Sequence, residues 1–111
     1  MNWVKVCALT DLTPDVGAAA RVGDEQVALF YLPQLSPAVY ALDNWDPLGE
    51  AFVISRGIVG DQGGIPCVAS PLYKHHYQLA DGRCLEESAV ALRVWPVRLD
   101  GGEVYIQSRG G

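Results

Sequence analysis

Two stretches of this 111-residue chain are the most informative about its fold: Val68–Leu79, VASPLYKHHYQL, and the earlier Ala38–Phe52, AVYALDNWDPLGEAF. In each stretch an apolar run leads directly into a polar loop. The first loop, at 44–52, carries a tryptophan and a proline, and the second carries Ser-Pro-Leu-Tyr-Lys followed by two histidines. Because functional side chains are concentrated on loops that a rigid scaffold positions, these two loops are the first candidates for a site.

The rest of the chain is predicted to be β-structure. Helical periodicity is nearly absent, and short β-branched and aromatic runs alternate with turn signals. We expect strands near residues 3–7, 18–22, 26–32, 38–43, 53–59, 67–70, 75–79, 83–85, 91–99 and 104–107, and helical turns only within 11–17 and 86–91. Gly23-Asp24 predicts a hairpin, and Pro96 predicts an edge or a bend. Such a series predicts an all-β fold, an antiparallel sandwich or a small barrel.

The composition and net charge of the chain limit the classes of molecule that it is expected to bind. Eight basic and 13 acidic residues give a net charge of −5, with no basic cluster. Nucleic acid and anionic membranes are disfavoured, because their binding depends on neutralised phosphates. Charged residues make up 19% of the chain, below the roughly 25% of an average domain. We therefore expect another protein to cover part of the surface; a surface rich in alanine and glycine is the alternative.

The start of the chain, MNWVKVCALTDL, has no long apolar run and no small-residue cleavage site. Nothing in the sequence approaches the roughly 18 unbroken apolar residues of a membrane span. We therefore expect a cytoplasmic protein.

The cysteines and histidines do not form a metal-binding pattern. Cys7, Cys67 and Cys84 form no CxxC pair, so we expect reduced thiols that are buried as small hydrophobic side chains. His75 and His76 are adjacent, and successive side chains of a strand point to opposite faces. They cannot easily hold one ion together, and a zinc site needs three or four ligands. The histidines are thus predicted to be ordinary strand residues.

Catalysis and phosphate binding also lack a motif. Ser70 has no GxSxG context, and only an assumption would place Asp46 or Asp81 beside a histidine to orient it. The glycine-rich segment 60–66, GDQGGIP, leads into a strand rather than a helix N-terminus. We therefore predict a flexible loop there and no catalytic residue in the chain.

Four ordered stretches give the chain a resemblance to a known family. They are VALFYL (27–32), AVYALDNWDPLGEAFVISRGIVGD (38–61), VASPLYKHHYQLADGRCLE (68–86) and VWPVRLDGGEVYI (94–106). Over nearly its whole length the chain resembles Rieske-type iron–sulfur domains, and more narrowly the small subunits of assimilatory NADH-dependent nitrite reductases. The resemblance implies a single Rieske-like domain over 1–111, with a cluster-type subdomain at about 44–82 and a base subdomain formed by the remainder.

The resemblance places the ligand positions of a Rieske cluster on unsuitable residues. The Cys-x-His box falls on 44–46 and the Cys-x-x-His box on 70–73, so Asn44 and Ser70 replace cysteines while Asp46 and Tyr73 replace histidines. A Rieske [2Fe–2S] centre needs two thiolates and two imidazoles, and oxygen donors do not substitute for soft thiolates. We therefore expect no metal and no cofactor on this chain.

Other interactions must then hold the two loops together. We expect the four replacing side chains to hydrogen-bond to each other or to the opposite backbone, with the Tyr73 ring filling the place of the metal. The alternative is that these side chains face water.

In the family that the chain resembles, the large subunit carries FAD, an iron–sulfur cluster and sirohaem and reduces nitrite to ammonium with electrons from NADH. The resemblance implies that this chain is an accessory, non-redox subunit for that partner in nitrate assimilation. The candidate partner contacts are Trp45, Leu48, Phe52, Lys74 and His75. For Trp45 a cap on the barrel end is the alternative, whereas Trp3 and Trp95 are expected in the core.

Two other functions stay open. The chain could be a cluster-free Rieske-like binding module of another oxidoreductase, or an electron carrier whose [2Fe–2S] cluster has unorthodox ligands. Identification of the partner distinguishes the first, and iron and sulfide analysis distinguishes the second.

Overall fold

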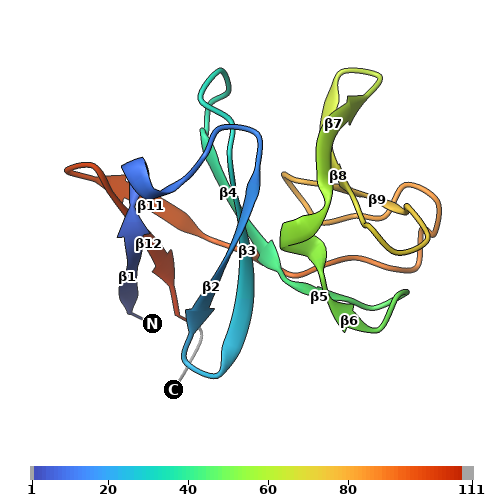
Figure 1. The fold of residues 1–111 in the computed structure, drawn as a ribbon, viewed down its shortest axis with the longest axis horizontal. Helices are drawn as coiled ribbons and strands as arrows, with labels where there is room; N and C mark the ends of the chain where they lie inside the picture. Colours follow the sequence, from blue (N-terminus) through green and yellow to red (C-terminus); the bar gives the residue numbers. More distant parts are fainter. Residues whose placement is uncertain (1, 109–111) are drawn as a thin grey trace.

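The computed structural model describes residues 2–108, which form short strands and two 3₁₀ turns (Figure 1). The strands are β1 (Trp3–Ala8), β2 (Gly17–Val22), β3 (Glu25–Tyr31), β4 (Val39–Asp43), β5 (Trp45–Asp46), β6 (Ala51–Phe52), β7 (Ile58–Gln62), β8 (Ile65–Ala69), β9 (His76–Gln78), β10 (Val94–Trp95), β11 (Val97–Asp100) and β12 (Glu103–Gln107), and the 3₁₀ turns are η1 (Leu9–Asp11) and η2 (Ile54–Arg56). The predicted all-β class is confirmed. Among these residues no helix has the length and apolar character needed to span a membrane.

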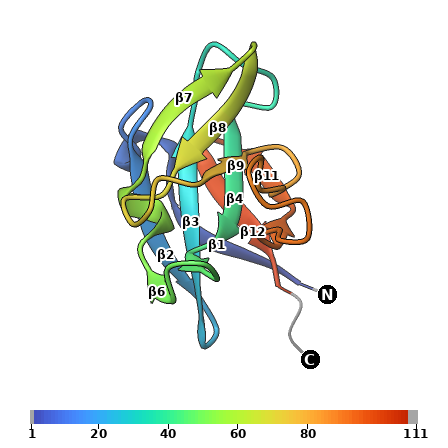
Figure 2. The ribbon, with the colours of Figure 1, turned by 90° about the vertical axis from the view of Figure 1, so that its right-hand side faces the viewer.

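The strands form four antiparallel sheets, none of which closes into a barrel. The base of the molecule consists of the sheet β1-β12-β11 and the sheet β10-β4-β3-β2, on the left and in the middle of Figure 1. The opposite end holds the ribbon β5-β6 and the sheet β7-β8-β9, which face the viewer in Figure 2. The chain enters this end after β4 and returns to the base at β10, so the two loops of interest lie in one inserted region.

Strand β3 organises the packing because both of its faces are buried. Val27 and Leu29 face one side and Ala28 and Phe30 the other, and none is more than 1% exposed. The first pair belongs to the core of the base, with Leu12, Val22, Val39, Ala41, Trp95, Val104 and Ile106. The second pair belongs to the core under the inserted region, with Leu32, Leu42, Ile54, Val68, Tyr77, Leu79, Cys84 and Leu92. An unbroken apolar run is what a strand buried on both faces requires.

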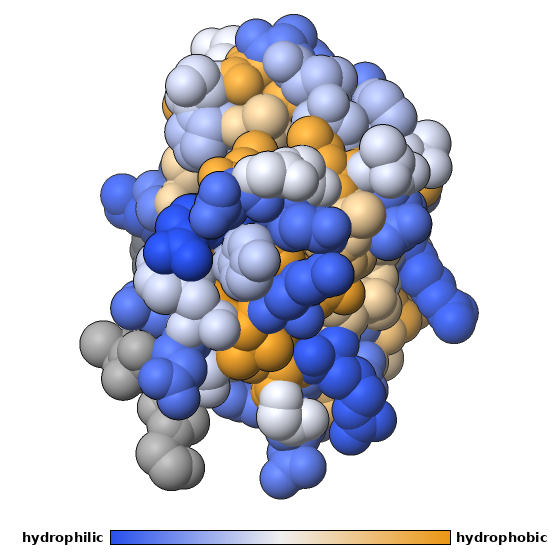
Figure 3. All heavy atoms as spheres, turned by 90° about the vertical axis from the view of Figure 1, so that its left-hand side faces the viewer, coloured by the Kyte–Doolittle hydropathy of each residue, from blue (hydrophilic) through white to orange (hydrophobic). Residues whose placement is uncertain are grey.

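The outer face of the base has a mixed surface. Figure 3 shows hydrophilic side chains over much of it, with apolar side chains between them. The Arg98 guanidinium lies 5.0 Å from the centre of the Trp3 ring and 5.3 Å from that of Tyr105, so charged side chains cover aromatic ones here. Trp3 is only half-buried, whereas Trp95 is 2% exposed, so the core prediction is confirmed for Trp95 and wrong for Trp3.

Turn and proline residues in the sequence predicted two features of the fold correctly. The hairpin at Gly23 joins β2 to β3 as predicted. Pro96 separates β10, which pairs with β4, from β11, which pairs with β12. The predicted bend is therefore the point at which the chain passes from one base sheet to the other.

The segment 60–66 is not the flexible loop that its glycines predict. Gln62 pairs with Ile65 across a two-residue turn between β7 and β8. Gly63 and Gly64 both have positive φ, 61° and 87°. Hairpin turns with positive φ at both central residues match the twist of their strands and favour glycine, so these glycines make a regular hairpin.

Three further expectations need correction. Residues 54–56 form η2, and the strand expected over 53–59 begins only at Ile58. Within 83–85 only Arg83 and Cys84 make isolated bridges and no strand forms, and 86–91 form no helical turn. The turn expected within 11–17 lies earlier, at η1, because the Asp11 carboxylate accepts the backbone N–H of Ala8 at 2.9 Å. That side-chain bond closes the turn before Asp11 rather than after it.

The return of the chain to the base depends on close backbone contact at Gly82. A Cβ atom added there would lie 2.0 Å from the Leu92 carbonyl oxygen, and Gly82 has a φ of 78°. Gly23 has a similar φ of 63° but open space around its missing Cβ. A side chain at either position would strain the backbone, but only a side chain at Gly82 would also collide with a neighbouring residue.

We predict that Gly82→Ala lowers the free energy of unfolding by at least about 3 kcal/mol, whereas Gly23→Ala lowers it by about 1–2 kcal/mol. Urea denaturation followed by tryptophan fluorescence measures both. Equal losses for the two variants would contradict the steric role of Gly82.

Candidate functional site

The two loops singled out by the sequence meet at one end of the molecule. The first begins as β4 ends and contains the ribbon β5-β6, and the second joins β8 to β9. The Ser70 hydroxyl donates a hydrogen bond to Asp46 Oδ2 at 2.5 Å, across 24 positions of sequence. This contact joins the two boxes directly, as predicted for side chains at the ligand positions.

Asp46 is the centre of the site. Its side chain is fully buried. Besides Ser70, the Tyr77 hydroxyl donates to Asp46 Oδ1 at 2.7 Å and the backbone N–H of Leu48 donates to the same oxygen at 3.0 Å. A buried carboxylate is tolerated only when it is fully hydrogen-bonded, and here donors from three segments of the chain converge on it. We call Asp46, Ser70 and Tyr77 the carboxylate network.

Asn44 fixes the start of the first loop. It is 2% exposed, and its Oδ1 accepts the backbone N–H of Ser55 at 2.8 Å. Its Nδ2 donates to Gln26 Oε1 at 3.1 Å. Asn44 thus bonds to η2 and to strand β3, so it anchors the loop to the base instead of joining the second loop.

Tyr73 does not occupy the place of the metal, and this expectation is wrong. Its side chain is 75% exposed. Tyr73 and Lys74 both have left-handed backbone, with φ of 56° and 57°, and this turn carries the Tyr73 ring outward. The buried tyrosine is Tyr77, on strand β9, whose side chain alternates with His76 and Gln78. Sequence reasoning missed it as a site residue, although strand alternation provides the signal.

The pKa values reflect this geometry. Burial alone raises the pKa of Asp46, but the hydrogen bonds from Ser70, Tyr77 and the backbone N–H groups of Gly49 and Leu48 outweigh it and hold the pKa below its ordinary value. The pKa of Tyr77 is strongly raised by burial, and further by its hydrogen bond to the Asp46 charge. Asp46 is therefore an ionised acceptor and Tyr77 a protonated donor at neutral pH.

The donor set at the four ligand positions does not fit a [2Fe–2S] cluster. Asn44, Asp46, Ser70 and Tyr73 offer amide, carboxylate and hydroxyl oxygens, with no thiolate or imidazole. Both Asp46 oxygens already accept hydrogen bonds. Within residues 2–108, no three His, Cys, Asp or Glu side chains lie together as metal ligands.

The histidines and cysteines lie outside the network. His76 Nδ1 is 2.6 Å from Glu86 Oε2, on the surface of the sheet β7-β8-β9. The Nδ1 atom of His75 is buried and has no hydrogen-bond partner among the described residues. Cys7, Cys67 and Cys84 are free thiols, as expected, but Cys7 is only half-buried.

The predicted contact residues come from both loops, with Trp45, Leu48 and Phe52 in the first and Lys74 and His75 in the second. Trp45 and Phe52 are 39% and 51% exposed, and their ring centres are 4.9 Å apart in an edge-to-face arrangement. Lys74 is exposed, and Leu48 and His75 are half-buried. The alternative position of Trp45, as a cap on a closed barrel, does not exist because the sheets stay open. Partner contact by these residues remains a prediction.

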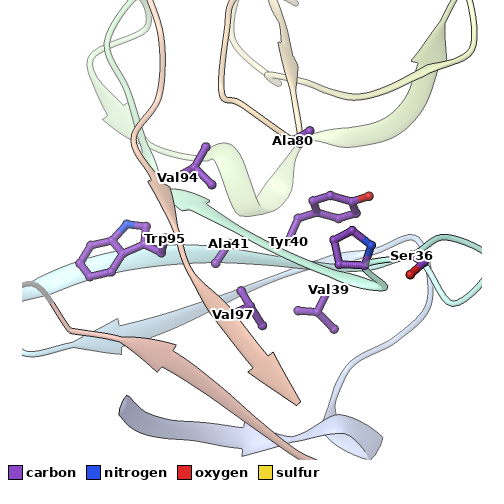
Figure 4. A pocket seen from close by; sticks show the side chains of 9 residues that line it. Ser36, Val39, Tyr40, Ala41, Ala80, Val94, Trp95 and Val97 are labelled. Carbon is purple, nitrogen blue, oxygen red and sulfur yellow. The ribbon is translucent and has the colours of Figure 1, made fainter. Parts of the chain in front are cut away.

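A mainly apolar surface pocket adds no chemistry to the site. It has a volume of about 440 Å³ and lies beside β4, β10 and β11, with mainly apolar side chains around it (Figure 4). None of the four ligand-position residues lines it. Its lining residues include the hydroxyl groups of Ser36 and Tyr40 but no histidine that could act as a base.

Comparison with known proteins identifies relatives along the whole described chain. The Rieske-like [2Fe–2S] domain family matches residues 2–107. The Escherichia coli K12 nitrite reductase (NADH) small subunit is 38% identical over 106 residues, covering 96% of this chain and 97% of that one. The solution structure of the nitrite reductase [NAD(P)H] small subunit from Erwinia carotovora has a TM-score of 0.80 at 38% identity, covering 98% of this chain and 83% of that one.

One relative is much longer than this chain. The Klebsiella oxytoca nitrite reductase [NAD(P)H] large subunit is 44% identical over 104 residues, covering 94% of this chain. This chain spans only 11% of that protein's length. A region of that large subunit therefore resembles nearly the whole of this chain.

We predict that Asp46→Ala lowers the free energy of unfolding by about 3–5 kcal/mol, because the Ser70 and Tyr77 hydroxyls and the Leu48 N–H lose a charged acceptor in a buried site. Asp100→Ala, which removes an exposed carboxylate on β11, serves as the control and changes it by less than about 0.5 kcal/mol. Urea denaturation measures both. Similar small losses would mean that the network does not hold the loops together.

The lowered pKa of Asp46 also predicts a pH dependence. Its stabilising contribution is fully present above the unfolded-state pKa of about 3.9 and is lost as pH falls through the lower folded-state pKa. The difference in unfolding free energy between wild type and Asp46→Asn should therefore be constant near neutral pH and shrink below about pH 4. Chemical denaturation from pH 3 to 7 tests this, and parallel curves over that range would refute it.

Proposed function

This chain belongs to the Rieske-like [2Fe–2S] domain family, in the branch of nitrite reductase (NADH) small subunits, and we propose that it acts there as a cluster-free accessory subunit. The carboxylate network carries the proposal. The two loops that present cluster ligands in the Rieske pattern are joined here by a hydrogen bond from the Ser70 hydroxyl to Asp46 Oδ2.

The partner in this proposal is the nitrite reductase large subunit. The Klebsiella large subunit contains a region that is 44% identical to this chain, so a similar domain is part of the large-subunit polypeptide there. A covalent link gives a domain a high effective concentration at its contact site. Without such a link, the same association would depend on surface complementarity, which the low charged fraction of 19% favours.

The redox chemistry is assigned to that partner. The family resemblance implies that the large subunit supplies FAD, an iron–sulfur cluster and sirohaem, and that nitrite is reduced to ammonium in the cytoplasm during nitrate assimilation. Oxygen donors in this chain do not hold a [2Fe–2S] cluster. Its role in the proposal is to bind the large subunit and stabilise or tune it.

The test uses the two subunits purified separately, the small one under anaerobic conditions. We expect the small chain to contain no stoichiometric iron or sulfide and to show no charge-transfer absorption in the visible range. We also expect it to form a stoichiometric complex with the large subunit by size-exclusion chromatography. Nitrite-dependent NADH oxidation, measured with and without the small chain, reports its effect on turnover.

The possible failures are distinct. Stoichiometric iron with visible charge-transfer bands would identify an electron carrier and overturn the cluster-free role. Absence of a complex at micromolar concentrations of both subunits would overturn the assignment of the partner. A lysate pull-down that recovers another oxidoreductase would then support the alternative binding module.

A further inference from the structure

A hollow between the base and the first loop has the chemistry of a cation-binding site. Its volume is about 190 Å³, and its lining comes from the β2–β3 turn, the start of β3, the end of β4 and the ribbon β5-β6. The lining residues are Asp24, Glu25, Gln26, Asp43, Trp45 and Phe52. Two aromatic rings and three carboxylates thus surround one small space, which we call the acidic–aromatic hollow.

The aromatic wall is exposed for a structural reason. Trp45 pairs with Phe52 and Asp46 pairs with Ala51 across the two-residue ribbon. Side chains of successive strand residues point to opposite faces, and Asp46 points inward to the carboxylate network. Trp45 and Phe52 must therefore point outward together, and no described segment covers them, since they are 39% and 51% exposed.

The hollow has an excess of negative charge. The Arg93 guanidinium bonds to Glu25 and to Asp43, so one cation serves two of the three carboxylates. Asp24 is exposed and makes no ion pair with any residue from 2 to 108. A further positive group entering the hollow would meet an unpaired carboxylate beside the Trp45 and Phe52 rings.

The molecule itself shows which cation suits such a place. The Arg93 guanidinium lies 4.2 Å from the centre of the Trp95 ring, and the Trp95 Nε1–H donates to Asp43 Oδ1 at 2.8 Å. Arginine, tryptophan and carboxylate already form one compact unit here, joined to the hollow through Asp43, which lines it. Planar guanidinium groups both stack on aromatic rings and pair with carboxylates, so a second arginine could repeat the arrangement at the surface.

We propose that the acidic–aromatic hollow binds an exposed arginine side chain of the nitrite reductase large subunit, and that Trp45 is the central contact of the interface. The inference rests on the proposed function, since it names the surface through which that complex forms. Charge complementarity carries it: the hollow is acidic, and the aromatic wall of Trp45 and Phe52 offers a cation–π contact beside its carboxylates.

The test measures the dissociation constant of the complex between this chain and the large subunit by titration at low and high salt. Trp45→Ala should weaken binding at least about tenfold. Asp24→Asn should weaken it about three- to tenfold at low salt, with a smaller effect at high salt because the charge is exposed. The matched controls, Leu99→Ala and Asp100→Asn, change an exposed apolar and an exposed acidic residue on β11 and should leave affinity unchanged.

Folding is checked separately by thermal denaturation of each variant. If Trp45→Ala is unstable, Phe52→Ala removes the other ring, and Trp45→Phe keeps an aromatic face and should retain most of the affinity. These variants are made in the full chain and leave the carboxylate network intact.

Each outcome has one meaning. No binding by the wild type overturns the proposed function, whereas wild-type binding that Trp45→Ala and Asp24→Asn leave unchanged overturns only this inference. Loss of affinity in Trp45→Ala without any effect of Asp24→Asn would show an apolar contact and refute the arginine. Self-association of the wild type that Trp45→Ala abolishes, measured by sedimentation, would identify a second copy as the occupant and also refute it.

Discussion

The buried carboxylate of Asp46 is the constraint on which the functional end of this protein depends. An ionised group that is fully removed from water is costly unless donors surround it, and these donors come from different segments: Ser70 after β8, Tyr77 on β9 and Leu48 in its own loop. The Asp46 carboxylate receives all of these hydrogen bonds only when the two loops lie together. The electrostatic requirement of one side chain therefore specifies the tertiary arrangement of both boxes.

Hydrogen bonds of this kind differ from cluster ligands in what they require of the fold. Metal–ligand bonds join two loops by themselves, whereas each hydrogen bond contributes a net amount of only about 1–3 kcal/mol and only while water is excluded. Exclusion here comes from the core beneath the inserted region, which includes Val68, Tyr77 and Leu79, none of them measurably exposed. Tyr77 belongs to both systems, because its ring packs in that core and its hydroxyl bonds to Asp46.

Structural features that depend on neighbouring residues in the sequence, such as strands and bends, could be predicted. The direction of side chains in the second loop could not, because it depends on the backbone conformation of that loop. The run 27–30 and the break at Pro96 were readable, because a doubly buried strand and a missing N–H act at their own positions. Position within the ligand box suggested Tyr73 as the group that fills the site. Two consecutive residues with left-handed backbone, Tyr73 and Lys74, turn the Tyr73 ring into solvent. The Tyr77 side chain points toward Asp46 because side chains alternate between the two faces of the strand that begins at His76.

The same alternation connects the interior network to the surface of the ribbon β5-β6. Each strand of that ribbon is only two residues long, so Trp45 must point outward when Asp46 points inward. Cross-strand pairing then places Phe52 beside Trp45. The bonds from Ser70 and Tyr77 thus fix not only the loop but also the direction in which the two rings face. A hairpin anchored by its buried carboxylate presents its aromatic face as a rigid element, and rigid aromatic anchors lose little conformational entropy on association.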